Sequence, residues 1–284
     1  MVVITQNTTD SELVFAIKNA IKNLTPLSVV RCGDGEMHIL KSANDIKETR
    51  DLPVHHHSMC LILSRENIYR CSIHSPIKNV GDKPICCTCY LNNHIHNSWR
   101  NEARQIISDS IKNSDYVGLC VPGHNPKYYT ISSEVLSRYG INSNKLKVIS
   151  SLFPRQKSFG SIESFKEIIQ GNDIHIITSN VKRFYENDIA KKLGVNVTYT
   201  DISTKPAHTK EVRELVKMNI KETDKKIILF GGGYAIKDLI PWSSKEYGKI
   251  SIDVGSTLDA WSGYKSRTMY DQLEFQHLVW TEVQ

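Results

Sequence analysis

The sequence predicts an α/β protein whose mostly parallel sheet has helices on both faces. From residue 115 onward, short apolar runs rich in β-branched residues alternate with segments of helical apolar spacing. This alternation is typical of parallel strands joined by right-handed helical crossovers. A similar apolar run lies near the start of the chain, directly before a glycine-flanked pair of carboxylates. Ligands of such sheets bind beyond the carboxyl ends of the strands, so we expect the functional residues there.

Each element is placed from its residue pattern. The first helix has Asp10 as its N-cap and follows the apolar spacing of Leu13, Val14, Ile17 and Ile21. Predicted strands occupy residues 27–30, 116–121, 148–149, 174–178, 195–199, 227–230 and 250–254. Predicted helices include residues 37–40, 165–169, 182–193 and 209–218 and a segment around 135–136. Gly194 is the expected C-cap of helix 182–193.

The first strand leads into two closely spaced carboxylates. The β-branched residues 29–30 indicate a buried strand, and Gly33 allows a sharp turn at its carboxyl end. Asp34 and Glu36 would leave an extended backbone on one face, where two hard oxygen ligands suit Mg²⁺ or Mn²⁺. The alternative is a polar turn whose carboxylates cap the next helix. Either way the pair lies at or near a helix N-terminus, where amide groups favour anions such as a diphosphate.

Two motifs carry a resemblance to a known family. The first reads Arg31-Cys32-Gly33-Asp34-Gly35-Glu36 and resembles the arginine, glycine, Asp-Gly-Glu signature of the GT-D type glycosyltransferases. The second, residues 250–256, is similar to the late strand of that family, which ends in Asp-x-Gly.

The resemblance implies a Rossmann-like fold and a metal-dependent sugar transfer from a UDP-sugar. Asp34 and Glu36 would bind Mn²⁺ or Mg²⁺ and thereby the donor diphosphate, and Arg31, Gly33 and Gly35 would lie beside the nucleotide sugar. Some family members carry a histidine just after the glycine of the late strand, where this chain has Ser256, which we also place at the nucleotide sugar.

The composition bounds the class of protein. The 284 residues suffice for one large domain, 1–284. Lys plus Arg number 36 against 30 for Asp plus Glu, a mild excess without the arginine-rich block of a nucleic-acid binder. The first ten residues lack the pattern of a secretory signal, and no apolar run is long enough to span a membrane. Seven cysteines, an odd number, indicate reduced thiols. We therefore expect a cytoplasmic protein.

The segment at about 51–104 has no regular pattern and is predicted to be an irregular insertion that forms part of an acceptor site. It contains Cys86 and Cys89 with the spacing of a zinc knuckle, followed by His94 and His96. The two ligand pairs stand too close together for the usual zinc modules. Buried free cysteines beside a substrate-facing loop are the alternative.

Three consecutive glycines follow the strand at 227–230. Gly231, Gly232 and Gly233 would expose backbone amides just before a helix that starts near Tyr234, and such amides can bind a phosphate. A tight strand-to-helix turn with no ligand explains the same residues.

Other polar residues at strand ends are candidates for the same site. Arg155 and Arg183 can bind phosphate oxygens through their guanidinium groups, and Asn180 follows a strand. His208 and Asp259 are candidates for the base that deprotonates an acceptor hydroxyl. The alternatives are surface arginines and helix caps.

We therefore expect a metal-dependent glycosyltransferase that uses a nucleotide sugar, UDP-linked by the resemblance, and a glycan or glycoconjugate acceptor. A metal-dependent phosphohydrolase or nucleotidyl transferase could use the same carboxylates and phosphate-binding elements. A non-catalytic nucleotide-binding protein is the third possibility. The sequence does not specify the donor sugar, the linkage or the oligomeric state.

Overall fold

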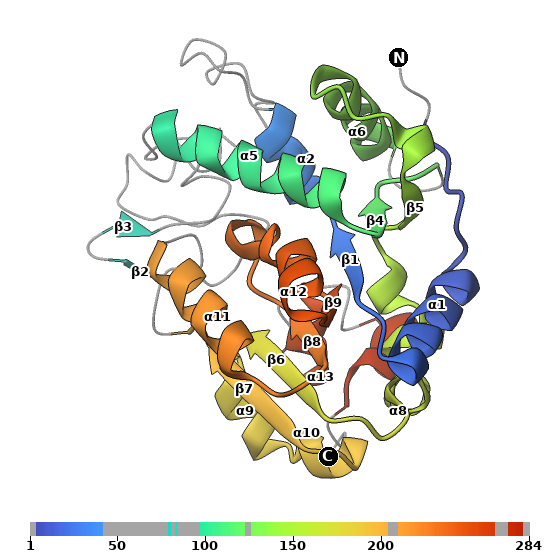
Figure 1. Ribbon diagram of the computed structural model, residues 1–284, viewed down its shortest axis with the longest axis vertical. Coiled ribbons are helices and arrows are strands. Elements are labelled where there is room, and N and C mark those ends of the chain that lie inside the picture. The colour runs from blue at the N-terminus through green and yellow to red at the C-terminus, as the bar shows by residue number, and fades with distance from the viewer. Residues whose placement is uncertain are drawn as a thin grey trace.

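A seven-stranded parallel sheet forms the centre of the molecule (Figure 1). The computed structural model describes residues 4–41, 79–80, 83–84, 97–122, 126–203, 210–264 and 272–280. Within them the strand order is β5-β4-β1-β9-β8-β6-β7, and each neighbouring pair is parallel. The strands are β1 (Leu27–Arg31), β4 (Tyr116–Leu119), β5 (Lys147–Ser150), β6 (Ile174–Thr178), β7 (Val197–Asp201), β8 (Ile227–Phe230) and β9 (Ile250–Asp253). A separate antiparallel pair consists of β2 (Asn79–Val80) and β3 (Lys83–Pro84).

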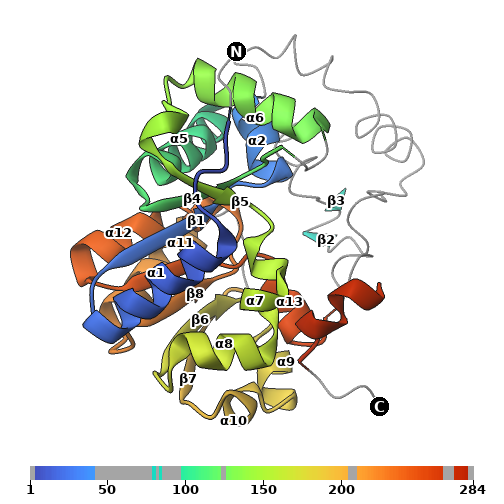
Figure 2. The same cartoon turned by 90° about the vertical axis from the view of Figure 1, so that its right-hand side faces the viewer.

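Helices cover both faces of the sheet (Figure 2). One face packs against α2 (Asp34–Lys41), α5 (Asn97–Asn113), α6 (Pro126–Arg138), α11 (Lys210–Glu222) and α12 (Leu239–Tyr247). The other packs against α1 (Asp10–Asn23), α7 (Lys157–Gly160), α8 (Ile162–Ile169), α9 (Val181–Glu186), α10 (Ile189–Leu193) and α13 (Thr257–Trp261). The short 3₁₀ helices are η2 (Ser143–Lys145), η3 (Phe153–Arg155), η4 (Tyr234–Ile236) and η6 (Leu273–Leu278).

Strand β1 lies in the interior of the sheet because it pairs with β4 on one side and β9 on the other. Val29 packs into one core and Val30 into the opposite core, and both are fully buried. Because side chains alternate between the faces of a strand, a strand buried on both sides must be apolar throughout. This explains the apolar run that precedes Arg31. The residues that follow β1 therefore emerge from the middle of the sheet, between two layers of helices.

The predicted α/β class, with a mostly parallel sheet covered on both faces, is confirmed. The strands at 174–178 and 227–230 match β6 and β8, and Gly194 caps α10 with a positive φ of 73°. The N-cap of α1 is Thr9 rather than Asp10, because Thr9 forms a capping box with Glu12. The helix predicted over 182–193 is two helices, since the chain turns at Asp188 with a φ of 49°.

The irregular segment predicted at about 51–104 lies mostly outside the described residues. The described part of this segment contains β2, β3 and the start of α5 at Asn97, so regular structure is present before Arg104. The zinc candidates Cys86, Cys89, His94 and His96 lie outside the described residues, as does His208. In the described part of the chain, Cys32 and Cys120 are buried and unbridged, as expected for reduced thiols.

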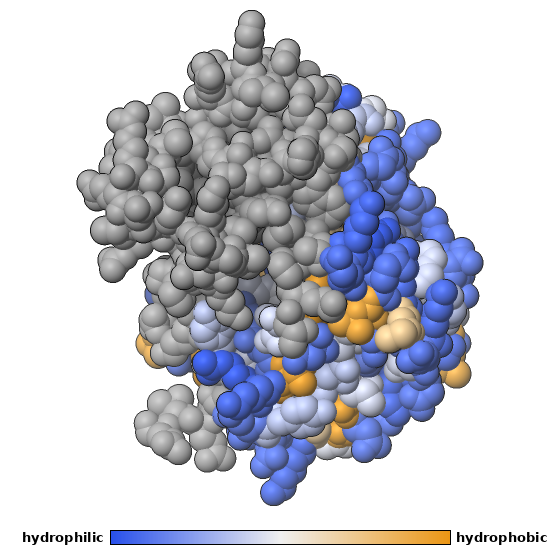
Figure 3. Space-filling view, turned by 90° about the vertical axis from the view of Figure 1, so that its left-hand side faces the viewer, coloured by the Kyte–Doolittle hydropathy of each residue, from blue (hydrophilic) through white to orange (hydrophobic). Residues whose placement is uncertain are grey.

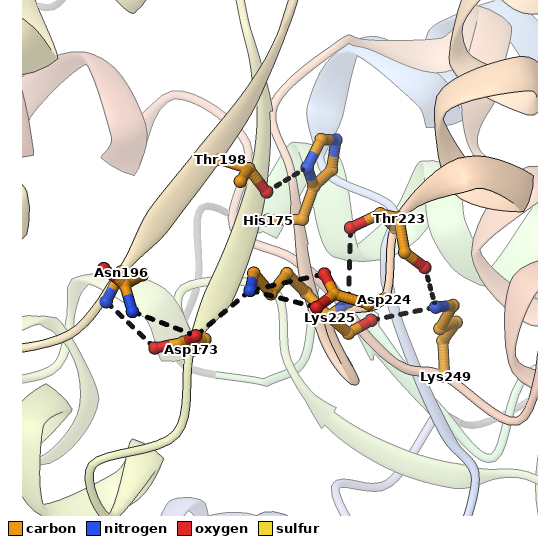
Figure 4. A network of polar contacts seen from close by, with 8 residues as sticks. All are labelled: Asp173, His175, Asn196, Thr198, Thr223, Asp224, Lys225 and Lys249. Atoms are coloured by element: carbon orange, nitrogen blue, oxygen red, sulfur yellow. Dashed lines mark hydrogen bonds and ion pairs between the residues drawn. The ribbon is translucent and has the colours of Figure 1, made fainter.

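Polar residues fill the other end of the sheet, at the amino ends of β6 to β9. We call this group the amino-edge network; it comprises Asp173, His175, Asn196, Thr198, Thr223, Asp224, Lys225 and Lys249 (Figure 4). Lys225 Nζ lies 3.1 Å from an Asp173 carboxylate oxygen, and Lys249 Nζ donates to two backbone carbonyls at 2.7 and 2.9 Å. These bonds fasten the loops that precede four strands.

The described surface is mainly hydrophilic in the view of Figure 3, where apolar residues gather only in small areas. Large exposed apolar side chains such as Phe15, Tyr185 and Leu273 come from different elements. Scattered exposed apolar residues are ordinary on a protein surface. Among the described residues, no helix has the length and apolar character that crossing a membrane requires.

Candidate functional site

The carboxyl ends of β1 and β9 meet where the chain leaves the sheet in opposite directions. After β1 the chain enters α2 on one face, and after β9 it enters α13 on the other. Such a topological switch point is where open α/β sheets bind ligands. We call residues 31–36 and 253–256 the β1–β9 junction. Both motifs singled out in the sequence lie here.

A buried lysine joins the elements of the junction. Lys237, just after η4, is 4% exposed. Its Nζ lies 2.5 Å from Asp253 Oδ2, 2.5 Å from the Arg31 carbonyl oxygen and 3.3 Å from Glu36 Oε1. Asp253 Oδ2 also accepts the Arg31 backbone N–H at 3.1 Å. The ammonium group thus ties β1, β9 and α2 together.

The side chain of Arg31 lies in the same place but has unused donors. Its Nε and Nη1 are buried and have no hydrogen-bond partner. The guanidinium group borders Gly255, where a Cβ would overlap Nη1, and its Nη2 lies 3.6 Å from the Cβ position of Gly33. Gly255 also has a positive φ of 52°, which favours glycine. Buried donors without partners are rare in folded proteins, and they often mark a place for a ligand.

Charges at the junction shift the pKa values of its groups. Burial raises the pKa of a carboxyl group, but the charges of Lys237 and Arg31 outweigh burial and hold the pKa of Glu36 below its usual value. Burial disfavours the charged form of Lys237, yet Asp253 and Glu36 raise its pKa overall. Burial also raises the pKa of the Cys32 thiol strongly. Glu36 and Lys237 are therefore ionised, and Cys32 is a neutral thiol without nucleophilic character.

The two motif carboxylates belong to a helix, not to an extended segment. α2 begins at Asp34, and positions two apart on a helix point about 200° apart around its axis. The expectation that Asp34 and Glu36 share one face applied to an extended backbone, and the backbone here is helical from Asp34 onward. Glu36 instead turns back, and its Oε2 accepts the Gly33 N–H at 3.0 Å. This is one half of a capping box, close to the capping alternative.

The donor chemistry of the junction fits a hard divalent cation. Among the described residues, Glu36 Oε2 accepts the Gly33 N–H and Oε1 contacts Lys237, and a carboxylate oxygen can accept more than one bond. Ligating carboxylates are commonly held in place by hydrogen bonds of this kind. The described residues contain no cluster of three or more His, Cys, Asp or Glu able to hold a metal. An ion at Glu36 and position 34 would therefore take most of its ligands from phosphate oxygens and water, as Mg²⁺ commonly does.

The three glycines after β8 form a tight turn beside the junction. Gly231 donates its N–H to the Ile177 carbonyl at 2.9 Å, and a Cβ on it would lie 3.4 Å from the Gly255 carbonyl oxygen. Gly232 packs against Ile236, and Gly233 has a φ of 70° with open space where a Cβ would be. The segment that starts at Tyr234 is a single 3₁₀ turn. Gly231 is thus a structural element of the turn, and Gly233 faces free space.

A second pair of candidates meets at the end of β6. Asn180 donates from Nδ2 to Asp259 Oδ1 at 2.5 Å, and Asp259 lies in the first turn of α13. The exposed Arg183 places its guanidinium carbon 5.0 Å from the centre of the Tyr264 ring. These contacts join α9 to α13. Asp259 is therefore held by Asn180 at the edge next to the junction.

Helix α13 is itself fixed by a pair of stacked tryptophans. The Trp261 and Trp280 rings lie 4.0 Å apart, and both indole N–H groups donate to the Gly160 carbonyl.

Ser256 occupies the N-cap position of α13. Arg155, in η3, accepts a bond from His277 at its carbonyl. The structure thus brings Arg31, Gly33, Glu36 and Ser256 to the β1–β9 junction.

Sequence reasoning missed Lys237 and assigned no function to Asp253. The signal for Lys237 was available, because Lys237 and Asp238 are the two charged residues within the otherwise apolar run 234–240. A lysine in such a run is buried only when acceptors compensate its charge. Asp253 at the tip of a buried strand is the natural acceptor.

The fold is thereby that of an α/β protein with charged residues gathered at the switch point of its sheet. A model of GT-D fold-like domains matches residues 97–261, more than half of the chain. The chain belongs to this GT-D-like family and carries a glycosyltransferase-type domain. A solved structure of domain of unknown function 1792 is similar over 100% of this chain and 92% of that chain, with 14% identity and a TM-score of 0.48. No curated protein matches the chain.

Proposed function

We propose that the chain is a metal-dependent glycosyltransferase that transfers a sugar from a UDP-sugar to a hydroxyl group of a glycan acceptor. The observation that carries the proposal is the buried, unpartnered guanidinium edge of Arg31 beside Glu36 at the β1–β9 junction. A guanidinium group binds phosphate oxygens through paired hydrogen bonds. Membership in the GT-D-like family supports a sugar-nucleotide donor as the source of the phosphates.

Each residue of the junction has a role in this mechanism. Arg31 binds the donor diphosphate through Nε and Nη1, and the glycines at 33, 35 and 255 leave room for the phosphates to approach. Asp34 and Glu36 would hold Mn²⁺ or Mg²⁺. The bound ion would neutralise the negative charge on the leaving diphosphate. Ser256 and Gly233 lie at neighbouring strand ends and contact the nucleotide sugar.

The acceptor side rests on fewer residues. Asp259, oriented by Asn180, is the described candidate for the base that deprotonates the acceptor hydroxyl, and His208 is the other candidate. Arg155 and Arg183 remain candidates for contacts farther from the junction.

Ligand-dependent thermal denaturation tests the donor and metal together. A ligand that binds only the native state raises the free energy of unfolding, by about 2.7 kcal/mol at a ligand concentration 100 times Kd, and therefore raises the melting temperature. We expect a shift with UDP-sugars in the presence of Mn²⁺ or Mg²⁺ that disappears with a chelator. No shift with any nucleotide would contradict the proposal.

Substitution of the motif tests the site. Asp34→Asn should abolish transfer while leaving the melting temperature of the free protein unchanged, because the amide lacks the charge that binds a cation. Asp224→Asn, an exposed carboxylate of the amino-edge network, is the matched control and should retain activity. Product analysis separates transfer from hydrolysis: release of free sugar and nucleotide without acceptor dependence would favour the phosphohydrolase alternative.

A further inference from the structure

We propose that Lys237 is a positioning residue whose ammonium group keeps the Arg31 guanidinium unpaired and therefore open to a phosphate-bearing ligand. This inference rests on the proposed function, because it assigns Arg31 to the ligand. It adds a residue that touches neither phosphate nor sugar and acts through the groups beside it.

The contacts of Lys237 satisfy the carboxylates that Arg31 would otherwise bind. Lys237 Nζ lies against Asp253 Oδ2 and Glu36 Oε1, at 2.5 and 3.3 Å. Asp253 is 3% exposed, and the Glu36 side chain is 18% exposed. The negative charges of Asp253 and Glu36 are thus compensated by one buried cation. Arg31 keeps two donors without an acceptor even though carboxylates lie nearby.

Arg31 and Glu36 are neighbours beside the Cβ position of Gly33, so a shift of their side chains would let them pair if this arrangement is disturbed. Arg31 Nη2 and Glu36 Oε2 each lie 3.6 Å from the same point, the Cβ position of Gly33. The charge of Arg31 already contributes to the lowered pKa of Glu36. A buried carboxylate that loses its cation takes the next available one, because an unpaired buried charge is costly. Without Lys237, the other cation beside Glu36 is Arg31, and pairing through Nη2 would move the guanidinium group whose Nε and Nη1 the ligand needs.

A second buried lysine shows what a purely structural role looks like. Lys249 is 6% exposed, and its ammonium group donates to the backbone carbonyls of Thr223 and Lys225. The acceptors of both bonds are backbone carbonyls rather than carboxylates, and Lys249 lies at the end of the sheet opposite the β1–β9 junction. Lys249→Met is therefore a matched control for Lys237→Met, since both remove a buried ammonium group and keep a similar apolar stem.

The test measures the binding of inorganic pyrophosphate by isothermal titration calorimetry. We expect Lys237→Met to weaken pyrophosphate binding at least tenfold and Lys249→Met to change it less than twofold. Lys237→Met leaves Asp253 without a cation and can unfold the protein. The double variant Lys237→Met with Asp253→Asn removes that charge, and the amide oxygen can still accept the Arg31 N–H. We expect this double variant to fold and still bind pyrophosphate at least tenfold more weakly than the wild type.

A crystal structure of the double variant provides a readout that needs no ligand. We expect an Arg31–Glu36 hydrogen bond there that the wild type lacks. A folded double variant with wild-type pyrophosphate affinity, or one in which Arg31 stays unpaired, would overturn the inference. Failure of the wild type to bind pyrophosphate or nucleotides would instead count against the proposed function, and the crystal structure would still decide the role of Lys237.

Discussion

The two ends of the central sheet both carry charged groups and use them differently. At the amino-edge network, Lys225 and Lys249 meet carboxylate and carbonyl oxygens (Figure 4). Both ring nitrogens of His175 bond threonine hydroxyls at 2.8 Å, and Figure 4 shows the bond to Thr198. At the β1–β9 junction, Lys237 is satisfied in the same way, but Arg31 beside it keeps two buried donors without partners.

This difference separates a structural edge from a binding edge. A fully satisfied polar network stabilises the fold and fixes the loops that precede the strands. Buried donors left unsatisfied cost stability, so they persist where another molecule completes them or where function requires them. The strands of a parallel sheet all present their carboxyl ends on one side, and that is the side on which the unsatisfied groups lie.

Replacement of Arg31 should give the largest effect on binding. Arg31→Met keeps the side-chain stem, which packs beside Gly118, and removes the charged donors. Hydrogen bonds to charged groups contribute about 1.5–3 kcal/mol, so pyrophosphate affinity should fall about tenfold to a hundredfold. The melting temperature should stay constant or rise, because Nε and Nη1 make no bond in the free protein. Calorimetry and thermal denaturation measure the two effects.

The control for Arg31 comes from the opposite edge. Lys225→Met removes the ion pair with Asp173, so it should lower the melting temperature slightly and leave pyrophosphate affinity unchanged. If Arg31→Met lowered stability as Lys225→Met does and left binding intact, the distinction between the two edges would be lost.

Acidification should act on the amino edge through His175. Burial lowers the pKa of His175 from 6.5 to about 4, and the charge of Lys249 adds to this effect. Below pH 6.5 the unfolded chain therefore binds a proton that the folded chain rejects, so stability falls as the pH drops from 6.5 toward 4. The loss between about pH 7.5 and about pH 5 should be about 2 kcal/mol.

Urea denaturation at the two pH values measures this loss. His175→Gln cannot take up the proton, so its free energy of unfolding should depend less on pH over this range. An equal pH dependence in the variant and the wild type would show that other groups are responsible.

The sequence alone predicted the elements more reliably than the site. Strands buried on both faces appear as continuous apolar runs, and this is why β6 and β8 were placed with their correct bounds. The Arg31 to Glu36 motif was found because glycines and carboxylates follow such a run. Helix ends were less certain, because a capping box at Thr9 and a positive φ at Asp188 depend on side-chain bonds and local backbone geometry.

The chemistry inside the junction depends on contacts distant in sequence. Lys237 and Glu36 are paired although they lie near opposite ends of the sequence, and no local pattern encodes that pairing. The unpartnered state of Arg31 likewise follows from what Lys237 does to its neighbours. The spacing of Asp34 and Glu36 suggested one face only for an extended backbone, whereas β1 ends at Arg31 and α2 starts at Asp34.

Two of the three glycines of the junction, Gly35 and Gly255, offer the smallest test of the comparison. Gly255 has a positive φ of 52°, and a Cβ there would overlap Arg31 Nη1, whereas a Cβ on Gly35 would have no neighbour within 4 Å. Gly255→Ala should cost about 1–2 kcal/mol for the left-handed backbone and should also weaken pyrophosphate binding, because Arg31 must move. Gly35→Ala should raise stability by up to about 1 kcal/mol, because alanine favours a helix more than glycine does. Urea denaturation without ligand and calorimetry with pyrophosphate measure both variants. If Gly255→Ala lost stability but bound pyrophosphate as the wild type does, the position of the guanidinium group would not control binding, and the junction would resemble the amino edge after all.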